Sequence, residues 1–142
     1  MASPDLNLRV AILGASGIGE VHARIMHSLG VQVVGILGST NSSAELTAEQ
    51  LNSKYGFSPA PYSDLEALLV NEKPEAISIC TPPEHHFLQL KSAFERNLPV
   101  FCEKPLLWEE NITSAKLESQ LDELKNYPEA ILLVNTSNST FL

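Results

Sequence analysis

Short strand-like runs alternate with helix-like patterns along the whole chain of 142 residues, and this alternation limits the fold more than any other feature. Runs that are rich in Val, Ile and Leu and lack polar alternation are typical of strands buried on both faces of a parallel sheet. A short proline-containing segment allows one further extended piece. Six strands are therefore predicted, at residues 9–13, 31–37, 59–62, 76–80, 100–102 and 131–134.

Helices are predicted in each interval between these strands, at residues 18–29, 42–55, 64–70, 84–96 and 111–125. Ser42 or Ser43 is expected to cap the second helix, and Ser63 with Glu66 is expected to form a capping box at the start of the third. The residues expected to end helices are Gly30, Gly56 and Asn97.

This unbroken alternation predicts right-handed crossovers and helices on both faces of the sheet. The predicted fold class is α/β: a doubly wound, mainly parallel six-stranded sheet with strand order 3-2-1-4-5-6, the Rossmann arrangement. A chain of this length usually forms one domain, and residues 1–142 are predicted to form it.

The charge and cysteine content argue against several classes of function. Seventeen acidic side chains against nine basic ones give a net charge of −8, which argues against a nucleic-acid partner. No apolar run approaches the roughly 18 residues that span a bilayer, and the N-terminus lacks the features of a signal peptide. Cys80 and Cys102 can form a disulfide if their strands are neighbours, but free thiols in a reducing cytoplasm are favoured. The expected location is therefore cytoplasmic.

The turn after the first strand, residues 14–19, has the spacing of a dinucleotide fingerprint. In that fingerprint the first glycine makes a tight turn, the second lets the backbone approach the pyrophosphate, and the third lets helix and strand pack closely. Gly14 and Gly19 fill the first and third roles, whereas Ser16, followed by Gly17, stands at the second. A plain strand-to-helix turn is the alternative. The position straight after the first strand favours cofactor binding by Gly14, Ser16, Gly17, Ile18 and Gly19.

The end of the second strand predicts the choice of cofactor. In NAD-binding domains an acid at this point binds the ribose hydroxyls and repels the additional phosphate of NADP. Here residues 37–42 contain neither an acid nor a base, and the first acid is Glu45. Ser39 and Thr40 offer hydroxyl groups to the cofactor instead. The expected cofactor is NAD or NADP, with a modest preference for NADP.

Two turns in the second half of the chain carry further candidate residues. Thr81, Pro82 and Pro83 follow the fourth strand, and Glu103 and Lys104 follow the fifth. Open α/β sheets bind their ligands at these carboxyl ends of the strands. A lysine there can hold a substrate hydroxyl or move its proton, so Lys104 is the candidate catalytic residue. A solvated ion pair between Glu103 and Lys104 is the alternative.

Together these motifs resemble the Gfo/Idh/MocA family of oxidoreductases. The matching elements are Gly14…Gly19…His22, Thr81-Pro82-Pro83…His86 and Cys102-Glu103-Lys104-Pro105. Members of this family transfer hydride between NAD(P) and a sugar, inositol or related polyol, and the chain is similar to their N-terminal coenzyme domain. The resemblance implies that Lys104 contacts the nicotinamide ribose and the reacting hydroxyl, and that Glu103 orients Lys104 or binds the cofactor. It also implies that Thr81, Pro82 and His86 border the cofactor.

The chain departs from the family pattern in two ways. Ser16 replaces the middle glycine, and the family's second domain, with its substrate-binding sheet and further catalytic residues, is absent from the 142 residues. The fragment is therefore expected to bind a dinucleotide without turning over a sugar-like substrate. It is also expected to self-associate through the sheet edge near residues 131–134.

Other functions stay open at this point. A non-catalytic nucleotide-sensing or regulatory protein would keep the same fold, although the intact Glu103–Lys104 pair argues against it. A short-chain dehydrogenase would need Tyr-x-x-x-Lys, which none of the three tyrosines provides. A metal site is not expected, because Cys80 and the two adjacent histidines after it lack ligand spacing. His22, between apolar neighbours, is interpreted as a packing residue.

Overall fold

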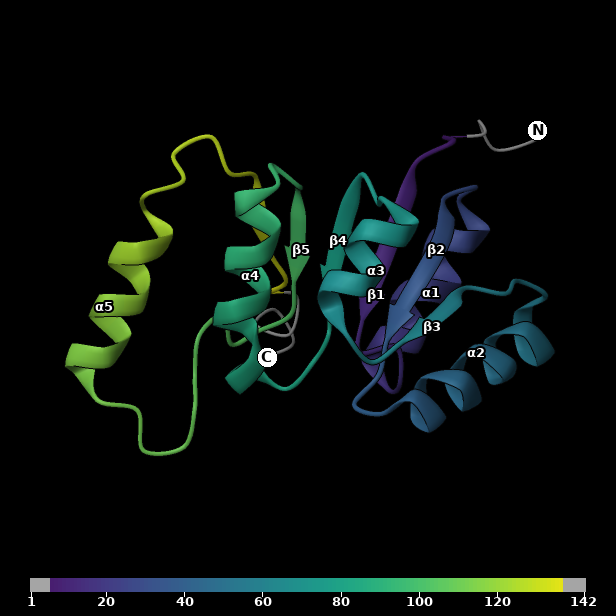
Figure 1. Ribbon diagram of the computed structural model, residues 1–142, viewed down its shortest axis with the longest axis horizontal. Coiled ribbons are helices and arrows are strands. Elements are labelled where there is room, and N and C mark those ends of the chain that lie inside the picture. The colour runs from purple at the N-terminus through teal and green to yellow at the C-terminus, as the bar shows by residue number, and fades with distance from the viewer. Residues whose placement is uncertain (1–5, 137–142) are drawn as a thin grey trace, which may run out of the picture.

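The computed structural model describes residues 6–136, in which strands and helices alternate as predicted (Figure 1). The ends of the predicted domain 1–142 lie outside the described residues. The strands are β1 (Arg9–Leu13), β2 (Gln32–Leu37), β3 (Ala60–Tyr62), β4 (Ala76–Ile79), β5 (Val100–Cys102) and β6 (Leu132–Val134). The helices are α1 (Ile18–Ser28), α2 (Asn41–Tyr55), α3 (Leu65–Glu72), α4 (His86–Glu95) and α5 (Ser114–Leu124), and a 3₁₀ turn, Pro83–His85, leads into α4.

All six strands pair in parallel, in the order β3-β2-β1-β4-β5-β6, which confirms the predicted topology. The chain adds strands outward from β1 to β3, returns, and then adds strands on the other side from β4 to β6. The direction of winding therefore reverses between β1 and β4. Doubly wound sheets bind ligands at such a reversal.

The core consists of two layers of apolar side chains, one on each face of the sheet. On one face α3, α4 and α5 pack against β1, β4 and β5, with Leu68, Leu90 and Leu124 among the buried residues. On the other face α1 and α2 pack against β1 and β2, with Ala23 and Leu51 buried. Helices cover both faces, as predicted, because strands buried on both sides need apolar partners on both.

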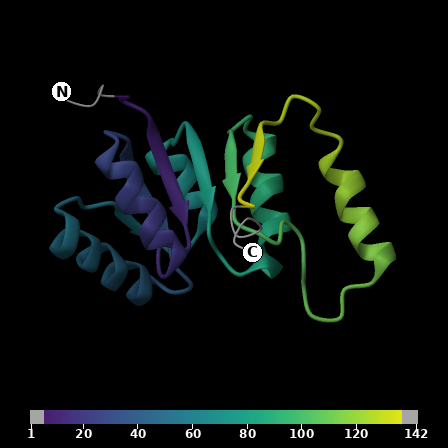
Figure 2. The same cartoon turned by 180° about the vertical axis from the view of Figure 1, so that it is seen from behind.

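One half of the second face carries no helix within the described part of the chain. Figure 2 shows α1 and α2 on the near side of β1, whereas no helix of residues 6–136 covers β5 and β6 on that side, which is called the open face below. Leu132 packs into the core of the far face, so strand alternation directs Leu133 to the open face. There 63% of Leu133 is exposed.

Helix α1 buries a different face from the one that its apolar residues indicate. Ile18, Val21 and Ile25, which recur at helical spacing, are exposed. The buried residues of the helix are Gly19, His22 and Ala23. The start of this face has no room for a side chain, because a Cβ at Gly19 would overlap the carbonyl oxygen of Gly14, the residue after β1. The periodicity predicted the helix correctly but not its buried face.

The first turns of α2 and α3 differ from the predicted caps. Thr40 caps α2: its hydroxyl accepts from the Ser43 N–H at 3.1 Å, while Ser43 Oγ accepts from the Thr40 N–H at 3.0 Å. Asp64 rather than Ser63 caps α3, and its carboxylate accepts a backbone N–H at 2.7 Å. The predicted Ser63–Glu66 capping box is therefore wrong, because the charged acceptor at the next residue binds the exposed N–H groups instead.

The remaining helix ends follow the predictions more closely. Thr113 caps α5, which begins later than predicted because Asn111 adopts a left-handed φ of 59°. Gly30, Gly56 and Asn97 all end helices in the left-handed region, with φ values of 82°, 78° and 54°.

The fold bears on two predictions, the one about a membrane-spanning segment and the one about the two cysteines. Between residues 6 and 136 no helix is long and apolar enough to cross a membrane. Strands β4 and β5 are neighbours, and Cys80 and Cys102 are free thiols.

Candidate functional site

The carboxyl ends of all six strands meet in register at one edge of the sheet. Pairing aligns Leu13 with Ile79, and Ile79 with Cys102. The first residue after each of five strands donates its N–H to a carbonyl oxygen at the end of the neighbouring strand, at 2.8–2.9 Å. These bonds run from Gly38 to Tyr62, Gly14 to Leu37, Cys80 to Leu13, Glu103 to Ile79 and Asn135 to Cys102. The predicted site residues Gly14 and Glu103 therefore lie in one row along this edge.

A groove of about 710 Å³ lies at this edge, over the ends of β1, β2 and β4. Five predicted site residues line it: Gly14, Ser16, Ser39, Thr81 and Pro82. The volume is that of a pocket for a cofactor-sized ligand. The groove thus lies where the direction of winding reverses, and it unites the Gly-rich turn with the turn after β4.

Part of the groove lining was missed at the level of sequence. Its additional polar side chains are Ser43, Thr47, Gln50, Ser63, His85 and Gln89. Three of them, Ser43, Thr47 and Gln50, are spaced so that they share one face of α2. A helical wheel of α2 would have shown that these three polar residues share one face.

Gly14 and Gly19 hold the start of α1 against the sheet. A Cβ at Gly14 would lie 2.9 Å from the Thr81 nitrogen, and the residue has a φ of +80°. A Cβ at Gly19 would overlap the carbonyl oxygen of Gly14 and lie 3.3 Å from Cys80 Cβ. Both positions require glycine, because backbone atoms occupy the space that a side chain would need. The first and third fingerprint roles thus correspond to real close approaches.

The N-terminus of α1 is free of side-chain caps. Gly17, the N-cap, has φ 59° and ψ −121°, and a Cβ there would meet nothing within 4 Å. The N–H groups of Gly19 and Glu20 donate to Ser16 and Gly17, whereas those of Ser16, Gly17 and Ile18 have no acceptor in the described part of the chain. Open space beside unsatisfied N–H groups at a helix start suits an anion such as a phosphate.

The loop after β2 presents hydroxyl groups and no charge to the groove. A Cβ at Gly38 would lie 2.9 Å from the Ala44 nitrogen, so the first side chain that can reach the groove is that of Ser39. Thr40, predicted to contact the cofactor, caps α2 and does not line the groove. None of the described lining residues is an Asp, Glu, Lys or Arg.

His86 lies behind the turns rather than in the groove. Only 1% of it is exposed, and its Nε2 lies 2.8 Å from the Thr81 carbonyl oxygen. Its Nδ1 lies 3.0 Å from the carbonyl oxygens of Pro105 and Leu106. The ring therefore joins the turn after β4 to the loop after β5; His86 does not line the groove, and its expected place bordering the cofactor stays a prediction. The groove is lined by His85 instead.

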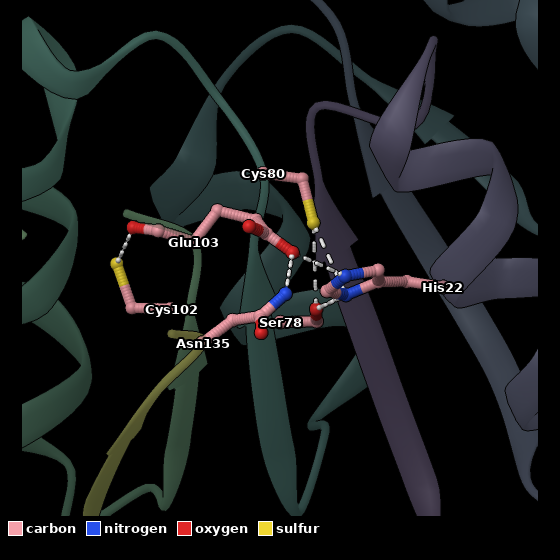
Figure 3. A network of polar contacts seen from close by, with 6 residues as sticks. All are labelled: His22, Ser78, Cys80, Cys102, Glu103 and Asn135. Atoms are coloured by element: carbon pink, nitrogen blue, oxygen red, sulfur yellow. Dashed lines mark hydrogen bonds and ion pairs between the residues drawn. The ribbon is translucent and has the colours of Figure 1, made fainter. Parts of the chain in front are cut away.

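A polar network crosses the open half of the sheet, as Figure 3 shows. His22 of α1 places Nε2 2.7 Å from Glu103 Oε1 and Nδ1 2.7 Å from Ser78 Oγ. The Asn135 amide donates to the same Glu103 oxygen at 2.8 Å, and Cys80 Sγ lies 3.3 Å from His22 Nδ1. His22 is thus more than the packing residue expected from sequence, because it hydrogen-bonds across two strands.

This network does not form a nucleophilic site. Serine, histidine and glutamate stand in hydrogen-bonding order, but Ser78 has an exposure of 0% and no substrate reaches it. Burial raises the pKa of the Cys80 thiol to about 11, so the thiolate needed for attack is scarce at neutral pH. The network is therefore structural or orienting rather than hydrolytic.

Glu103 and Lys104 do not form the ion pair that sequence left open. Glu103 turns towards His22 and Asn135, with 13% of its side chain exposed, whereas Lys104 is exposed. Within residues 6–136 Lys104 has no ion-pair or hydrogen-bond partner. The Lys104–Pro105 peptide bond is cis. Lys104 lies at the same sheet edge as the groove but does not line it.

Known dehydrogenases are similar to this chain in sequence or in structure. The D-glucoside 3-dehydrogenase of Escherichia coli K12 is 35% identical over 100 residues, which cover 69% of this chain and 27% of that protein. The crystal structure of myo-inositol 2-dehydrogenase from Lactobacillus plantarum superposes with a TM-score of 0.72 at 27% identity, covering 91% of this chain and 36% of that one.

A further solved structure shares the fold at lower identity. The scyllo-inositol dehydrogenase of Lactobacillus casei, with bound NAD(H) and scyllo-inositol, gives a TM-score of 0.72 at 15% identity, over 91% of this chain and 36% of that one. The matched part of the chain thus spans 27% to 36% of the length of these proteins.

The family comparison agrees with the geometry of the edge. Residues 8–134 match the family model described as an oxidoreductase family with an NAD-binding Rossmann fold. That span includes the Gly-rich turn, the groove and Glu103–Lys104. The chain belongs to the Gfo/Idh/MocA family of oxidoreductases, of which it contains the NAD-binding Rossmann domain.

Proposed function

We propose that this chain is the coenzyme-binding part of an NAD(P)-dependent oxidoreductase that acts on a sugar, inositol or related polyol by hydride transfer. The observation that carries the proposal is the groove of about 710 Å³ beside the uncapped start of α1. The groove has space for a nucleotide, and the free N–H groups give it an anion site. The activities of the glucoside and inositol dehydrogenases support the substrate class.

The residues present fit a dinucleotide along the sheet edge. The N–H groups of Ser16, Gly17 and Ile18 would bind the pyrophosphate, and the hydroxyl of Ser39 would bind the adenosine ribose. Thr81 and Pro82 would border the middle of the cofactor. The bound nicotinamide would supply the hydride acceptor or donor.

Lys104 would act at the far end of the same edge. An ammonium or amine group there can hold a substrate hydroxyl and accept or return its proton. The exposure of Lys104 leaves it accessible to a substrate. A free Lys104, rather than one neutralised by Glu103, favours an enzyme over a nucleotide-sensing protein.

We further propose a modest preference for NADP over NAD. The described groove lining contains no carboxylate that would repel a 2′-phosphate, and Ser39 offers a hydroxyl donor. No Arg or Lys lines the groove either, so the ratio of affinities is expected to be about tenfold or less, or about 1.4 kcal/mol.

The proposed location is the cytoplasm, and the proposed assembly is a homo-oligomer. The free thiols of Cys80 and Cys102 on neighbouring strands support a reducing compartment. The 63% exposure of Leu133 on edge strand β6 supports association.

The dinucleotide site can be tested by calorimetric titration of NAD and NADP. Gly14→Asp would bring a side chain within 2.9 Å of the Thr81 nitrogen and a negative charge to the phosphate end, so both cofactors should bind at least about tenfold more weakly. A matched control is Gly56→Asp, which also changes a left-handed glycine but lies at the end of α2. Equal affinity of Gly14→Asp and the natural chain would contradict the placement.

A further inference from the structure

The side chain of Glu103 is held from two sides at a single oxygen. Its Oε1 lies 2.7 Å from His22 Nε2 and 2.8 Å from Asn135 Nδ2. The backbone N–H of Glu103 continues the ladder by donating to the Ile79 carbonyl at 2.9 Å. Main chain and side chain are therefore both fixed at the residue that directly precedes Lys104.

His22 is itself fixed by a second contact. Its Nδ1 lies 2.7 Å from Ser78 Oγ on β4, and the Phe101 ring of β5 lies 5.1 Å from the imidazole centroid. A serine hydroxyl can donate to or accept from a ring nitrogen, so the contact survives in either tautomer. His22 thus links α1, β4 and the end of β5, with 9% of its surface exposed.

His22 and Asn135 together form a clamp on the Glu103 carboxylate, and this clamp keeps Glu103 from pairing with Lys104. The contacts with His22 and Asn135 hold the Glu103 carboxylate on the α1 side, where it makes no ion pair with Lys104. Without the clamp, the carboxylate would be free to turn towards the ammonium group of Lys104, and such an exposed pair would compete with ligand for the lysine.

We propose that His22 is a positioning residue for the Lys104 site: it binds Glu103 through Nε2 and so keeps the carboxylate from pairing with Lys104, which stays free for ligand at the nicotinamide end of the site. This inference rests on the proposed function for the role of Lys104. It does not require His22 to touch a cofactor, and His22 does not line the groove.

Two substitutions of the same residue separate the two contacts. Glutamine carries its amide nitrogen near the position of His Nε2, whereas asparagine carries it near that of Nδ1. His22→Gln therefore keeps a donor for Glu103, and His22→Asn keeps a partner for Ser78 only. The matched control is His27→Gln on the same helix, because the exposed His27 stacks on Phe57 and does not contact Glu103.

Calorimetric titration of the chain with ADP and with NAD gives the main measurement. The two ligands share adenosine and two phosphates, and only NAD carries the nicotinamide riboside. His22→Asn should weaken NAD binding by about tenfold and ADP binding by less than about twofold, the loss expected for one charge-assisted hydrogen bond. His22→Gln should stay within about threefold of the natural chain for both ligands, and His27→Gln should match it.

Amide hydrogen exchange tests the clamp without any ligand. In His22→Asn the Glu103 N–H should exchange about tenfold faster, while the Cys80 N–H in the same row keeps its rate. Equal acceleration of both amides, or equal loss of ADP and NAD affinity, would show a general structural role and overturn the inference. A natural chain that binds neither ligand would refute the proposed function, and the exchange of Glu103 would still decide whether the clamp exists.

Discussion

Replacing Gly19 by alanine tests the close packing that brings α1 against the Gly-rich turn. The added methyl group would overlap the carbonyl oxygen of Gly14 and lie 2.8 Å from its carbonyl carbon and 3.3 Å from Cys80 Cβ. The first two atoms belong to the backbone and cannot rotate away. The helix start or the turn must therefore shift to accept the methyl group.

The magnitude follows from two opposing effects. Alanine in a helix is favoured over glycine by about 1 kcal/mol. Overpacking against fixed atoms costs about 3 kcal/mol at the upper end of its usual range. Overpacking exceeds the gain in helix propensity, so the free energy of unfolding should fall by about 2 kcal/mol, which lowers Tm by about 6 °C for a chain of this size.

Thermal melts and ADP titrations of two variants make the test specific. Gly56→Ala also replaces a glycine, with φ +78°, but a Cβ there would meet nothing within 4 Å. It should cost about 1 kcal/mol of left-handed strain and leave ADP affinity unchanged. Gly19→Ala should lower both stability and ADP affinity, because it displaces the N–H groups of Ser16, Gly17 and Ile18.

Two results would refute this reasoning. Natural stability and natural ADP affinity in Gly19→Ala would show that the helix is not packed on the turn as closely as the geometry requires. Loss of ADP affinity in Gly56→Ala, in proportion to its loss of stability, would show that affinity follows global stability rather than the local contact.

A carboxylate in place of Ser39 should shift cofactor choice: Ser39→Asp is expected to weaken NADP relative to NAD by about tenfold or more in calorimetry. Ser42→Asp, which lies outside the groove lining, should leave that ratio unchanged. Leu133→Lys on β6 should shift the chain towards monomer in sedimentation equilibrium, and an unchanged mass would contradict association through the exposed Leu133 side of β6. Burial raises the pKa of Cys80 to about 11 and that of Cys102 to about 12, while unfolded thiols ionise near roughly pH 8.5. The two thiols should therefore leave the free energy of unfolding unchanged below that pH and lower it as the pH rises towards 11. The urea midpoint should fall less steeply with pH for Cys80→Ala than for the natural chain, and identical slopes would contradict the effect of burial.

Much of the fold was predictable because its strands carry their own signal. Runs such as 10–13 and 33–37 contain no polar side chain, since parallel strands are buried on both faces. Right-handed crossovers then leave few topologies, and the order 3-2-1-4-5-6 is confirmed. Gly14 and Gly19 were predictable for a similar reason, because only glycine permits such a close approach of the backbone.

The remaining site features depend on contacts between distant residues. The apolar spacing of α1 indicated a helix but could not reveal that its buried face is that of Gly19, which packs on the Gly14 backbone, and not that of Val21. His86 belongs to a family motif, yet only the fold shows that its ring binds backbone carbonyls behind the turn. The partner of Glu103 is 81 positions away in the sequence, and no local pattern identifies it.

Burying the His22–Glu103 pair has an energetic cost that its geometry must offset. Taking two ionisable groups out of water costs free energy that their attraction offsets only with good geometry, and apolar pairs of similar volume are often as stable. The hydrogen bonds at 2.7 and 2.8 Å to one oxygen of Glu103 supply that geometry, and β1 and β4 bring the partners together only because they are adjacent in the sheet. The winding reversal that places the groove between β1 and β4 therefore also sets α1 beside β5, so one feature of topology controls both the phosphate site and the contact between His22 and Glu103.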